Sequence, residues 1–329
     1  MSNRLNKLQF DWLVNGKESS TVFDIEKRHS RFPYFIPPEI GSGWGEMINT
    51  QHNVSLFRSE CSFKQEEAGI FVSLADISSK SDNPSWAIQM ATGGTIKHHD
   101  NLTGSNHVFG HGRCIIRYAK EVNFRPFAEK RNKITTSVLN LERDSLILML
   151  GEQRFESLMV AIGTKDLPTV ITHELPSSVS NLLNHAMLNP YQGKIRELFV
   201  QARALEFLCA LSLFSERYSS VRPDSRNKLM AIYDLHDELI KLDGKVPALT
   251  ELARKVGMSV RTMNHLFKET FGLSVRAFIT KQRFEEAHKA IEESRIPLKV
   301  IAFRLGYSHV NHFITGFKKE FGYTPGSLR

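Results

Sequence analysis

Cysteine is scarce in this chain. The 329 residues include only three, Cys61, Cys114 and Cys209, and no two of them form a CxxC pair. Three isolated cysteines predict neither a disulfide framework nor a zinc knuckle, and they favour a reducing, cytoplasmic environment. Common catalytic signatures are also missing, because the sequence has no P-loop, nucleophile elbow or HExxH motif. We therefore expect a protein that is not an enzyme and needs no cofactor.

Long hydrophobic runs are absent as well. Residues 1–10 are polar and lack an apolar stretch of signal-peptide length. Three polar residues interrupt the most apolar region, Leu198–Phe214; they are Gln201, Arg203 and Glu206. Neither segment is typical of a membrane anchor or span, so we expect no membrane partner.

Positive charge is in excess, and it is unevenly distributed. The formal net charge is +8. Residues 225–329 hold 18 Lys and Arg against 11 Asp and Glu, a net charge of +7, which leaves +1 for the other 224 residues. This asymmetry favours a nucleic-acid-binding module joined to a neutral module, although a basic surface without an acidic partner would give the same count.

The neutral part is rich in predicted β-structure. Residues 1–34 are polar and predict a flexible segment, whereas residues 35–176 alternate short apolar runs with turn residues. The runs expected to form strands begin at Val54, Gly69, Trp86, Cys114 and Ser145. Many short strands with regular turns predict an antiparallel sandwich or barrel.

The pattern becomes helical after Pro176. Segments 178–188 and 194–217 carry apolar residues three and four positions apart. In the second segment they form one stripe: Leu198, Ala202, Leu205, Leu208, Cys209 and Leu213. Such a stripe packs in a core or forms a dimer seam, and we interpret residues 177–218 as a helical dimerisation element of a homodimer. Residues 219–227 are polar, contain Pro223 and predict a linker.

The basic part, residues 228–329, contains a duplicated motif. Gly257 recurs 49 residues later as Gly306, while Phe267 recurs 50 residues later as Phe317. The two offsets differ by one, which places one inserted residue in the second-helix region of the second copy. Two copies are too few for a solenoid, so the pattern indicates a small duplicated unit.

Each copy has the turn and capping residues of a helix-turn-helix unit. The glycine suits the left-handed conformation that ends a helix. A serine two residues later, Ser259 or Ser308, suits the N-cap of the next helix. Helix, glycine turn and capped second helix together predict two helix-turn-helix units in one all-α domain.

The second helix of each copy has a polar face opposite its apolar face. In the first copy this face consists of Arg261, Asn264, His265 and Lys268. In the second copy it consists of Asn311, His312, Thr315 and Lys319. Such side chains match base edges in the major groove, whereas a solvated helix face is the alternative. Because the caps and glycines are duplicated, DNA recognition is the better hypothesis.

A predicted helix over residues 274–291 connects the copies. Its length is about 27 Å at 1.5 Å per residue. Successive major grooves on one face of DNA lie about 34 Å apart. A rigid helix of this length would place the two recognition helices in neighbouring grooves, so that one chain contacts both.

These features resemble the C-terminal domain of the AraC/XylS family of bacterial transcription regulators, over about residues 228–329. The segment from Gly306 to Arg329, with Pro325, is very similar to the signature of that family. The resemblance implies double-stranded DNA as a partner. It implies base contacts by Arg261, Asn264, His265, Asn311, His312 and Thr315, and a thymine-methyl contact by Val310. It also implies phosphate contacts by Lys268, Lys318 and Lys319.

The same resemblance implies an N-terminal, cupin-like barrel that binds a small-molecule effector, followed by helices that dimerise. The expected fold class is therefore α+β and multidomain, with an antiparallel β-barrel, a helical dimerisation element and an all-α double helix-turn-helix domain. Family members act on transcription, and an activator is our working hypothesis, although the sequence leaves the sign of regulation open.

Two clusters in the barrel are candidates for ligand chemistry. Arg113 and Arg117 are four apart, share one face of a strand and would clamp a phosphate or carboxylate. Their spacing resembles the arginine motif with which PilZ domains hold cyclic di-GMP. The alternative for the two arginines is a solvated pair without a ligand. The effector would then be a siderophore, a sugar or another organic metabolite. The second cluster is His98, His99, His107 and His111, for which a metal-dependent cupin-type enzyme is the remote alternative. Adjacent His98 and His99 would point to opposite faces of a strand, so we expect loop histidines and no metal.

Overall fold

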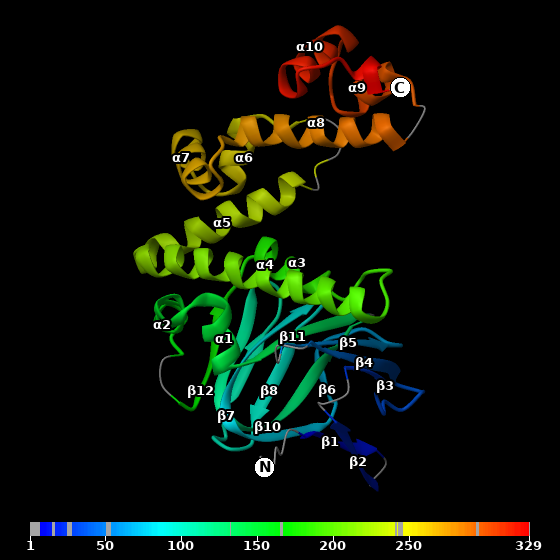
Figure 1. Ribbon diagram of the computed structural model, residues 1–329, viewed down its shortest axis with the longest axis vertical. Helices are drawn as coiled ribbons and strands as arrows, with labels where there is room; N and C mark the ends of the chain where they lie inside the picture. The colour runs from blue at the N-terminus through cyan, green and yellow to red at the C-terminus, as the bar shows by residue number, and fades with distance from the viewer. Residues whose placement is uncertain are drawn as a thin grey trace. The chain divides into compact units, whose positions relative to one another are not determined.

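The computed structural model describes residues 7–14, 17–24, 28–50, 54–131, 133–164, 167–240, 242, 246–293 and 296–328. The chain divides into two compact units, Met1–Val221 and Arg222–Arg329. The first unit contains an antiparallel sheet and helices α1 to α4, and the second is built from helices (Figure 1). The predicted fold class, a β-rich N-terminal part and an all-α C-terminal part, is confirmed.

One twelve-stranded sheet forms the body of the first unit. Its strands are β1 Lys7–Val14, β2 Lys17–Asp24, β3 His29–Pro33, β4 Gly41–Asn49, β5 Val54–Phe63, β6 Glu67–Ser73, β7 Asp76–Thr92, β8 Ile96–Asp100, β9 Asn106–Phe109, β10 Arg113–Lys130, β11 Ile134–Glu142 and β12 Thr169–Glu174. The main path runs β3-β4-β5-β11-β7-β10-β8-β9. Off this path, β2 pairs with β1, β1 with β7, and both β6 and β12 pair with β10.

Two long strands, β7 and β10, let the sheet close around its core. The first part of β10 pairs with β12 and with the end of β7, and its second part pairs with β8, β6 and the start of β7. The register shifts between Ala119 and Glu121, where the two parts meet. Irregularities of this kind bend a strand. The side chains on the inner side, including Met47, Ile96 and Ile115, form a buried core.

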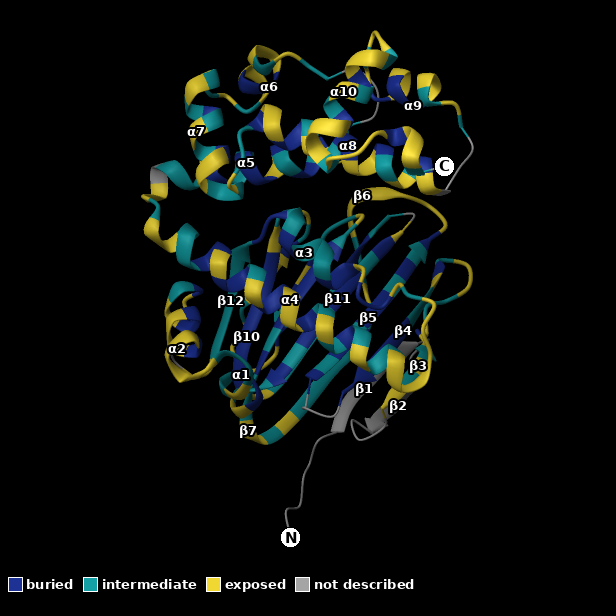
Figure 2. Ribbon diagram, turned by 45° about the horizontal axis from the view of Figure 1, so that its top comes forward, coloured by how far each residue is buried: buried dark blue, intermediate teal, exposed yellow. Residues whose placement is uncertain are grey.

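Four helices follow and flank the sheet: α1 Arg143–Leu150, α2 Glu152–Ala161, α3 Ser177–Asn184 and α4 Gly193–Ser220. Helix α4 packs against α2, α3 and strands β4 and β5. Its inner face buries Val200, Phe207, Leu211 and Phe214. Buried and exposed bands alternate along it, as expected for a helix with one face on a domain (Figure 2).

The structure corrects two expectations about the first unit. Residues 1–34 are not a flexible segment throughout, because β1, β2 and β3 lie within them. The run that starts at Ser145 is helix α1 and not a strand. It is rich in Leu and Met, which favour helices, and a short apolar run has no period that would separate the two structures.

The expected linker, residues 219–227, is also mostly helical. Helix α4 ends at Ser220 and α5 begins at Pro223, which leaves Val221 and Arg222 between them. Pro223 therefore starts a helix. At the first helical position its missing N–H costs nothing, because that N–H would have no intrahelical acceptor.

The second unit consists of α5 Pro223–Ile240, α6 Leu249–Lys255, α7 Val260–Phe271, α8 Val275–Glu293, α9 Leu298–Arg304, α10 Val310–Phe321 and the 3₁₀ turn Pro325–Leu328. It has two hydrophobic cores. One is formed by α5, α6, α7 and the start of α8, and the other by the end of α8 with α9 and α10. Helix α8 thus contributes to both, with Val275 and Phe278 in the first core and Phe284 and Ile291 in the second.

Candidate nucleic-acid interface and effector cavity

The first helix-turn-helix unit consists of α6, a turn and α7. Gly257 in the turn has a φ of 65°, in the left-handed region that glycine adopts without penalty. Ser259 is the N-cap of α7, and its side chain accepts a hydrogen bond from the Thr262 backbone N–H at 3.1 Å. Met263 and Phe267 on the inner face of α7 are buried in the first core. The turn and the cap are as the sequence predicts.

The outer face of α7 presents most of the residues that the resemblance assigned to DNA. Arg261, His265 and Lys268 are exposed. His265 lies 3.6 Å from Glu269, one turn further along the helix. Three of the four first-copy candidates are therefore free to approach a groove.

Asn264 differs from these three. Its side-chain N–H donates to the Val260 carbonyl at 3.2 Å, and its side-chain oxygen accepts from the Val275 backbone N–H at 3.2 Å. The residue is half-buried. A bidentate contact with adenine needs both amide atoms, which here already have partners within the protein.

The second unit repeats this arrangement with one change in its turn. Gly306 has a φ of 80°, as expected. The N-cap of α10 is His309 and not Ser308, and its side chain makes no capping hydrogen bond. Helices α7 and α10 have equal length and start 50 residues apart, at Val260 and Val310. The inserted residue therefore lies in the turn before α10 and not inside the helix.

The outer face of α10 presents five exposed candidates: Asn311, His312, Thr315, Lys318 and Lys319. Val310 is half-buried and packs against the second core, so it lies at the edge of this face. Phe313 and Phe317 on the opposite side are fully buried. The two recognition helices thus have the same design, an aromatic inner face and a polar outer face.

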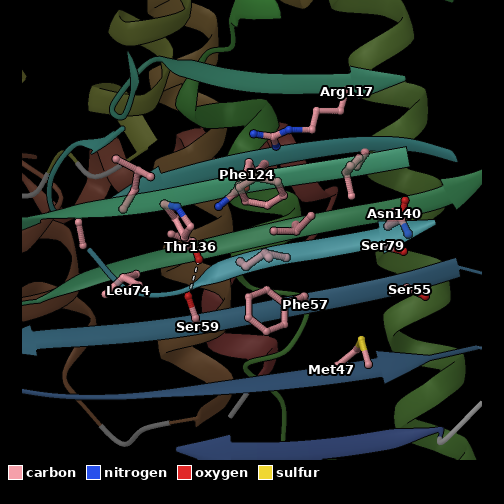
Figure 3. A pocket seen from close by; sticks show the side chains of 18 of the residues that line it. Met47, Ser55, Phe57, Ser59, Leu74, Ser79, Arg117, Phe124, Thr136 and Asn140 are labelled. Carbon is pink, nitrogen blue, oxygen red and sulfur yellow. Dashed lines mark hydrogen bonds between the residues drawn. The ribbon is translucent and has the colours of Figure 1, made fainter. Parts of the chain in front are cut away.

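A cavity of about 150 Å³ lies inside the β-barrel. Its lining comes from β4, β5, β7, β8, β10 and β11 and is mostly apolar, with Met47, Phe57 and Phe124 among the side chains (Figure 3). Ser59 and Thr136 hydrogen-bond to each other across neighbouring strands at 2.5 Å. No sequence pattern singles out these lining residues, because their alternation along the strands is the same as in an ordinary barrel core.

Arg117 is a charged residue that reaches this cavity. Its side chain extends toward Phe124 (Figure 3), and its guanidinium carbon lies 4.1 Å from the centre of that ring. It hydrogen-bonds to Nδ1 of His98, which is fully buried and stacks on Phe124 at 4.6 Å. Within the described residues, Arg117 forms no ion pair with a carboxylate, and its Nε has no hydrogen-bond partner.

Burial governs the protonation of this pair. Removal from water lowers the pKa of the Arg117 guanidinium to about 10, although Asp100 acts in the opposite direction. The same burial, reinforced by the charge of Arg117, holds the pKa of His98 well below 6.5. At neutral pH the site therefore combines a cationic arginine with a neutral histidine.

Arg113 does not join Arg117. It is exposed at the start of β10 and donates to the Thr172 hydroxyl on β12 at 3.0 Å. It is not among the residues that line the cavity. Residues four apart on a strand share a face but are about 13 Å apart, because a strand rises about 3.3 Å per residue. The arrangement gives one buried arginine in place of a two-arginine clamp.

The four histidines do not form a common site. His98 and His107 are partners across β8 and β9, so the expectation of loop histidines is wrong for them and for His99. His98 is in the barrel interior, His99 hydrogen-bonds to Asn106 at 3.0 Å, and His107 bonds to the Ser105 hydroxyl at 2.8 Å. His111 is exposed. Within the described part of the chain, no group of three or more His, Cys, Asp or Glu residues is placed to hold a metal ion.

Helix α4 has a second apolar face, turned away from the sheet. Leu198 and Leu213 on this face are 65% and 66% exposed, and Cys209 is exposed as well. Of the predicted stripe, Leu208 belongs to the buried face, and Ile195 extends the exposed one. We call the exposed set Ile195, Leu198, Ala202, Leu205, Cys209 and Leu213 the outer stripe of α4. Its members recur at three- and four-residue steps, as in a two-helix seam.

By length and composition, α4 is apolar enough to cross a membrane. However, 44% of its most apolar window is buried inside the protein, and one such helix is weak evidence of a span. A core helix of a globular domain has the same properties, and the contacts of α4 with β4 and β5 are of that kind.

Comparisons with known proteins bear mainly on the second unit. A family model described as a helix-turn-helix domain matches residues 252–329. The virulence regulon transcriptional activator VirF of Yersinia enterocolitica is 32% identical over 201 residues, 61% of this chain and 62% of the relative. The transcriptional activator RhaS of Escherichia coli is 31% identical over 78 residues, 24% of this chain and 28% of the relative. The chain thus spans less than two thirds of either relative.

One solved structure aligns with a larger part of the chain, but at lower sequence identity. ToxT from Vibrio cholerae, described as bound to an unsaturated fatty acid, covers 80% of this chain and 96% of its own, with 12% identity and a TM-score of 0.27. A likeness of this size supports no argument about ligand or mechanism. The matched segment, the two glycine turns and the paired recognition helices agree with one another, and this chain has a C-terminal helix-turn-helix domain of the AraC family.

Proposed function

We propose that this protein is a transcription regulator that binds a specific duplex DNA sequence through both recognition helices of one chain. The observation that carries the proposal is the pair of exposed polar faces on α7 and α10, each mounted on its own core. Helix α8, which connects the cores, has 19 residues and a length of about 28 Å. This length is of the same order as the distance between successive major grooves, which lie about 34 Å apart on one face of DNA.

Electrostatics supports DNA as the partner. The net charge of +7 in residues 225–329 lies in the unit that carries the recognition helices. Lys268 on α7, with Lys318 and Lys319 on α10, is exposed and near a helix end, where lysines contact phosphates. These contacts give affinity, and exposed residues such as Arg261 and Asn311 give base selectivity.

The test is selection from random duplexes with the full chain, followed by titration of the selected duplex at several salt concentrations. We expect one enriched sequence with two half-sites and an affinity that falls steeply with salt, as phosphate-bound counterions are released. Each variant Lys318→Ala or Lys319→Ala is expected to reduce the salt slope by about 1 and to leave the selected sequence unchanged. Failure to enrich any sequence would refute the proposal.

The first unit is proposed to sense a small-molecule effector in the barrel cavity. The supporting observation is Arg117, a buried cation that lines an apolar cavity; the charge of Asp100 acts on it, but no described carboxylate pairs with it directly. Burying a charge is costly unless it is paired, so an anionic group of a ligand would complete the site. The apolar remainder of the lining calls for an apolar body on the same molecule.

The cavity also limits the size of the effector. A volume of about 150 Å³ is close to that of an engineered apolar cavity that binds benzene. We therefore favour a small aromatic or aliphatic carboxylate. Cyclic di-GMP gains no support, because only one of the two arginines reaches the cavity.

The active form is proposed to be a homodimer joined by the outer stripe of α4. We also propose that it has no enzymatic activity. Two copies of the stripe are self-complementary, and association would bury leucines that are otherwise exposed. A regulator of this kind acts in the cytoplasm, where the DNA is. That VirF and RhaS are described as activators supports activation as the sign of regulation.

A further inference from the structure

The position of each recognition helix depends on how its core is attached to α8. Hydrophobic packing at both ends of α8 holds the cores together but is not directional. A core could rotate slightly about α8 while keeping most of its apolar contacts. Hydrogen bonds are directional and would remove this freedom. Asn264 and Arg283 form such bonds, one at each half of the unit.

The first bond joins α7 to the start of α8. Asn264 on α7 accepts from the backbone N–H of Val275, the first residue of α8, at 3.2 Å. The first N–H groups of a helix have no acceptor within the helix, so Asn264 caps α8 from a neighbouring helix. Its amide N–H donates to the Val260 carbonyl at the start of α7, which fixes the orientation of the cap.

The second bond joins the middle of α8 to the second turn. Arg283 on α8 is only 8% exposed, and its guanidinium donates to the carbonyl oxygen of Leu305. Leu305 is the C-cap of α9 and precedes the turn glycine Gly306. The last carbonyls of a helix lack intrahelical donors and carry partial negative charge, so a cation is a favourable partner there.

We propose that Asn264 and Arg283 are positioning residues that lock the two recognition helices onto α8 and so determine the spacing between the two DNA half-sites. Asn264 then contributes to the geometry of recognition and reads no base. This inference rests on the proposed function and revises the role of one residue of the recognition face. It predicts that these residues act on half-site spacing, whereas Arg261 acts on base identity.

The test compares affinities of the full chain for the selected duplex and for duplexes with one base pair inserted between the half-sites. One added base pair rotates one half-site by roughly 35° relative to the other. Wild type is expected to bind the lengthened duplex much more weakly than the native one. Asn264→Ala is expected to lose about threefold to tenfold on the native duplex and to discriminate less between the two spacings.

A conservative variant separates the two roles of Asn264. Asn264→Asp keeps the acceptor at the start of α8, where negative charge is favourable. A positioning role predicts that this variant retains the wild-type spacing preference and most of its affinity. A base contact predicts the reverse, because a carboxylate facing adenine and the phosphates would be repelled. Greater loss for Asn264→Asp than for Asn264→Ala, confined to one base pair, would overturn the inference.

The second bond is tested with Arg283→Met, and with Arg283→Lys in case the first variant does not fold. Lysine retains a cationic donor but not the planar fork, and weaker spacing preference is expected in either variant. Arg261→Ala serves as the control and should keep the spacing preference while losing selectivity at one base pair. Unchanged spacing preference in both Asn264→Ala and Arg283→Lys would overturn the inference while the proposed function stands. If wild type selects no sequence, the proposed function falls and this inference with it.

Discussion

The guanidinium of Arg117 lies 4.1 Å from the ring centre of Phe124, beside a cavity inside the barrel. Arg117 is 4% exposed, and its guanidinium donates a hydrogen bond to the neutral ring of His98. The aromatic face, this hydrogen bond and the charge of Asp100 offset part of the cost of burial. An anionic group of an effector would offset the rest of this cost, so we expect the effector to bind at Arg117.

Replacing Arg117 tests the effector site. Arg117→Met retains the volume of the side chain and removes the buried charge, so the melting temperature should not fall by much. Binding of benzoate, used as a probe carboxylate, should weaken about tenfold to a hundredfold in calorimetric titration, since a hydrogen bond to a charged group is lost. Arg113→Met is the matched control and should bind like wild type. Equal benzoate affinity in Arg117→Met and wild type would contradict the assigned site.

Protonation of His98 should make the first unit sensitive to acid. Burial holds the pKa of His98 well below 6.5 in the folded state, so the folded protein keeps this ring neutral as the pH falls. Below about pH 6.5, His98 binds a proton in the unfolded chain but not in the folded chain. The free energy of unfolding therefore falls with decreasing pH, by up to about 1.4 kcal/mol per pH unit from this residue.

The measurement is urea unfolding followed by tryptophan fluorescence between pH 8 and pH 5. All three tryptophans, Trp12, Trp44 and Trp86, are in the first unit, so the signal reports that unit. His98→Gln should give a flatter pH dependence, and the control His312→Gln, in the second unit, should retain the wild-type slope. The same slope in His98→Gln and wild type would show that another group is responsible.

A close approach between α10 and α8 can be tested at Gly316. A Cβ at this position would lie 2.5 Å from Cζ of Phe284, a ring that is buried in the second core and has little room to move. We expect Gly316→Ala to lower the free energy of unfolding of the second unit by about 1–3 kcal/mol, even though alanine favours helix.

Gly326→Ala is the control for this prediction, because a Cβ there would have no neighbour within 4 Å. Circular dichroism at increasing urea concentration measures both variants. A more stable Gly316→Ala would show that α10 can move away from α8 at no cost, contrary to the packing described above.

The outer stripe of α4 predicts the oligomeric state. Leu198→Glu with Leu213→Glu would place two charges in the proposed seam, and sedimentation should then show a monomer where wild type is a dimer. Leu148→Glu on α1 is the control, since Leu148 is at least as exposed as these two leucines but lies outside the stripe. A wild-type monomer, or a dimer that persists in the double variant, would contradict the proposed interface.

Local sequence signals predicted the second unit well. Gly257, Gly306 and Ser259 act through their own backbone positions, so their roles can be inferred from residue type and spacing. The exact position of the inserted residue could not be predicted, because the repeated residues Gly306 and Phe317 only delimit the segment that contains it. The N-cap at His309 places it in the turn before α10. The hydrogen bond between Asn264 and Val275 could not be predicted, because Val275 belongs to the next helix and does not affect the periodicity of α7.

The cavity could be predicted only in part. The sequence singles out Arg117, which lines the cavity, but it also pairs Arg117 with Arg113, because spacing along a strand fixes the face and not the distance. The partners His98 and Phe124 come from β8 and the second part of β10, so their meeting depends on how the sheet curves. The sequence alone contains no local signal for that curvature.

The central claim, that both recognition helices read DNA bases, is tested most directly by selecting duplexes from random sequence with wild type, Arg261→Ala and Asn311→Ala in parallel. The account predicts that wild type enriches one two-part sequence and that each variant loses preference at a base pair in a different half-site, by about 1–3 kcal/mol. If both variants enrich the same sequence with the same selectivity as wild type, the recognition faces assigned to α7 and α10 are wrong.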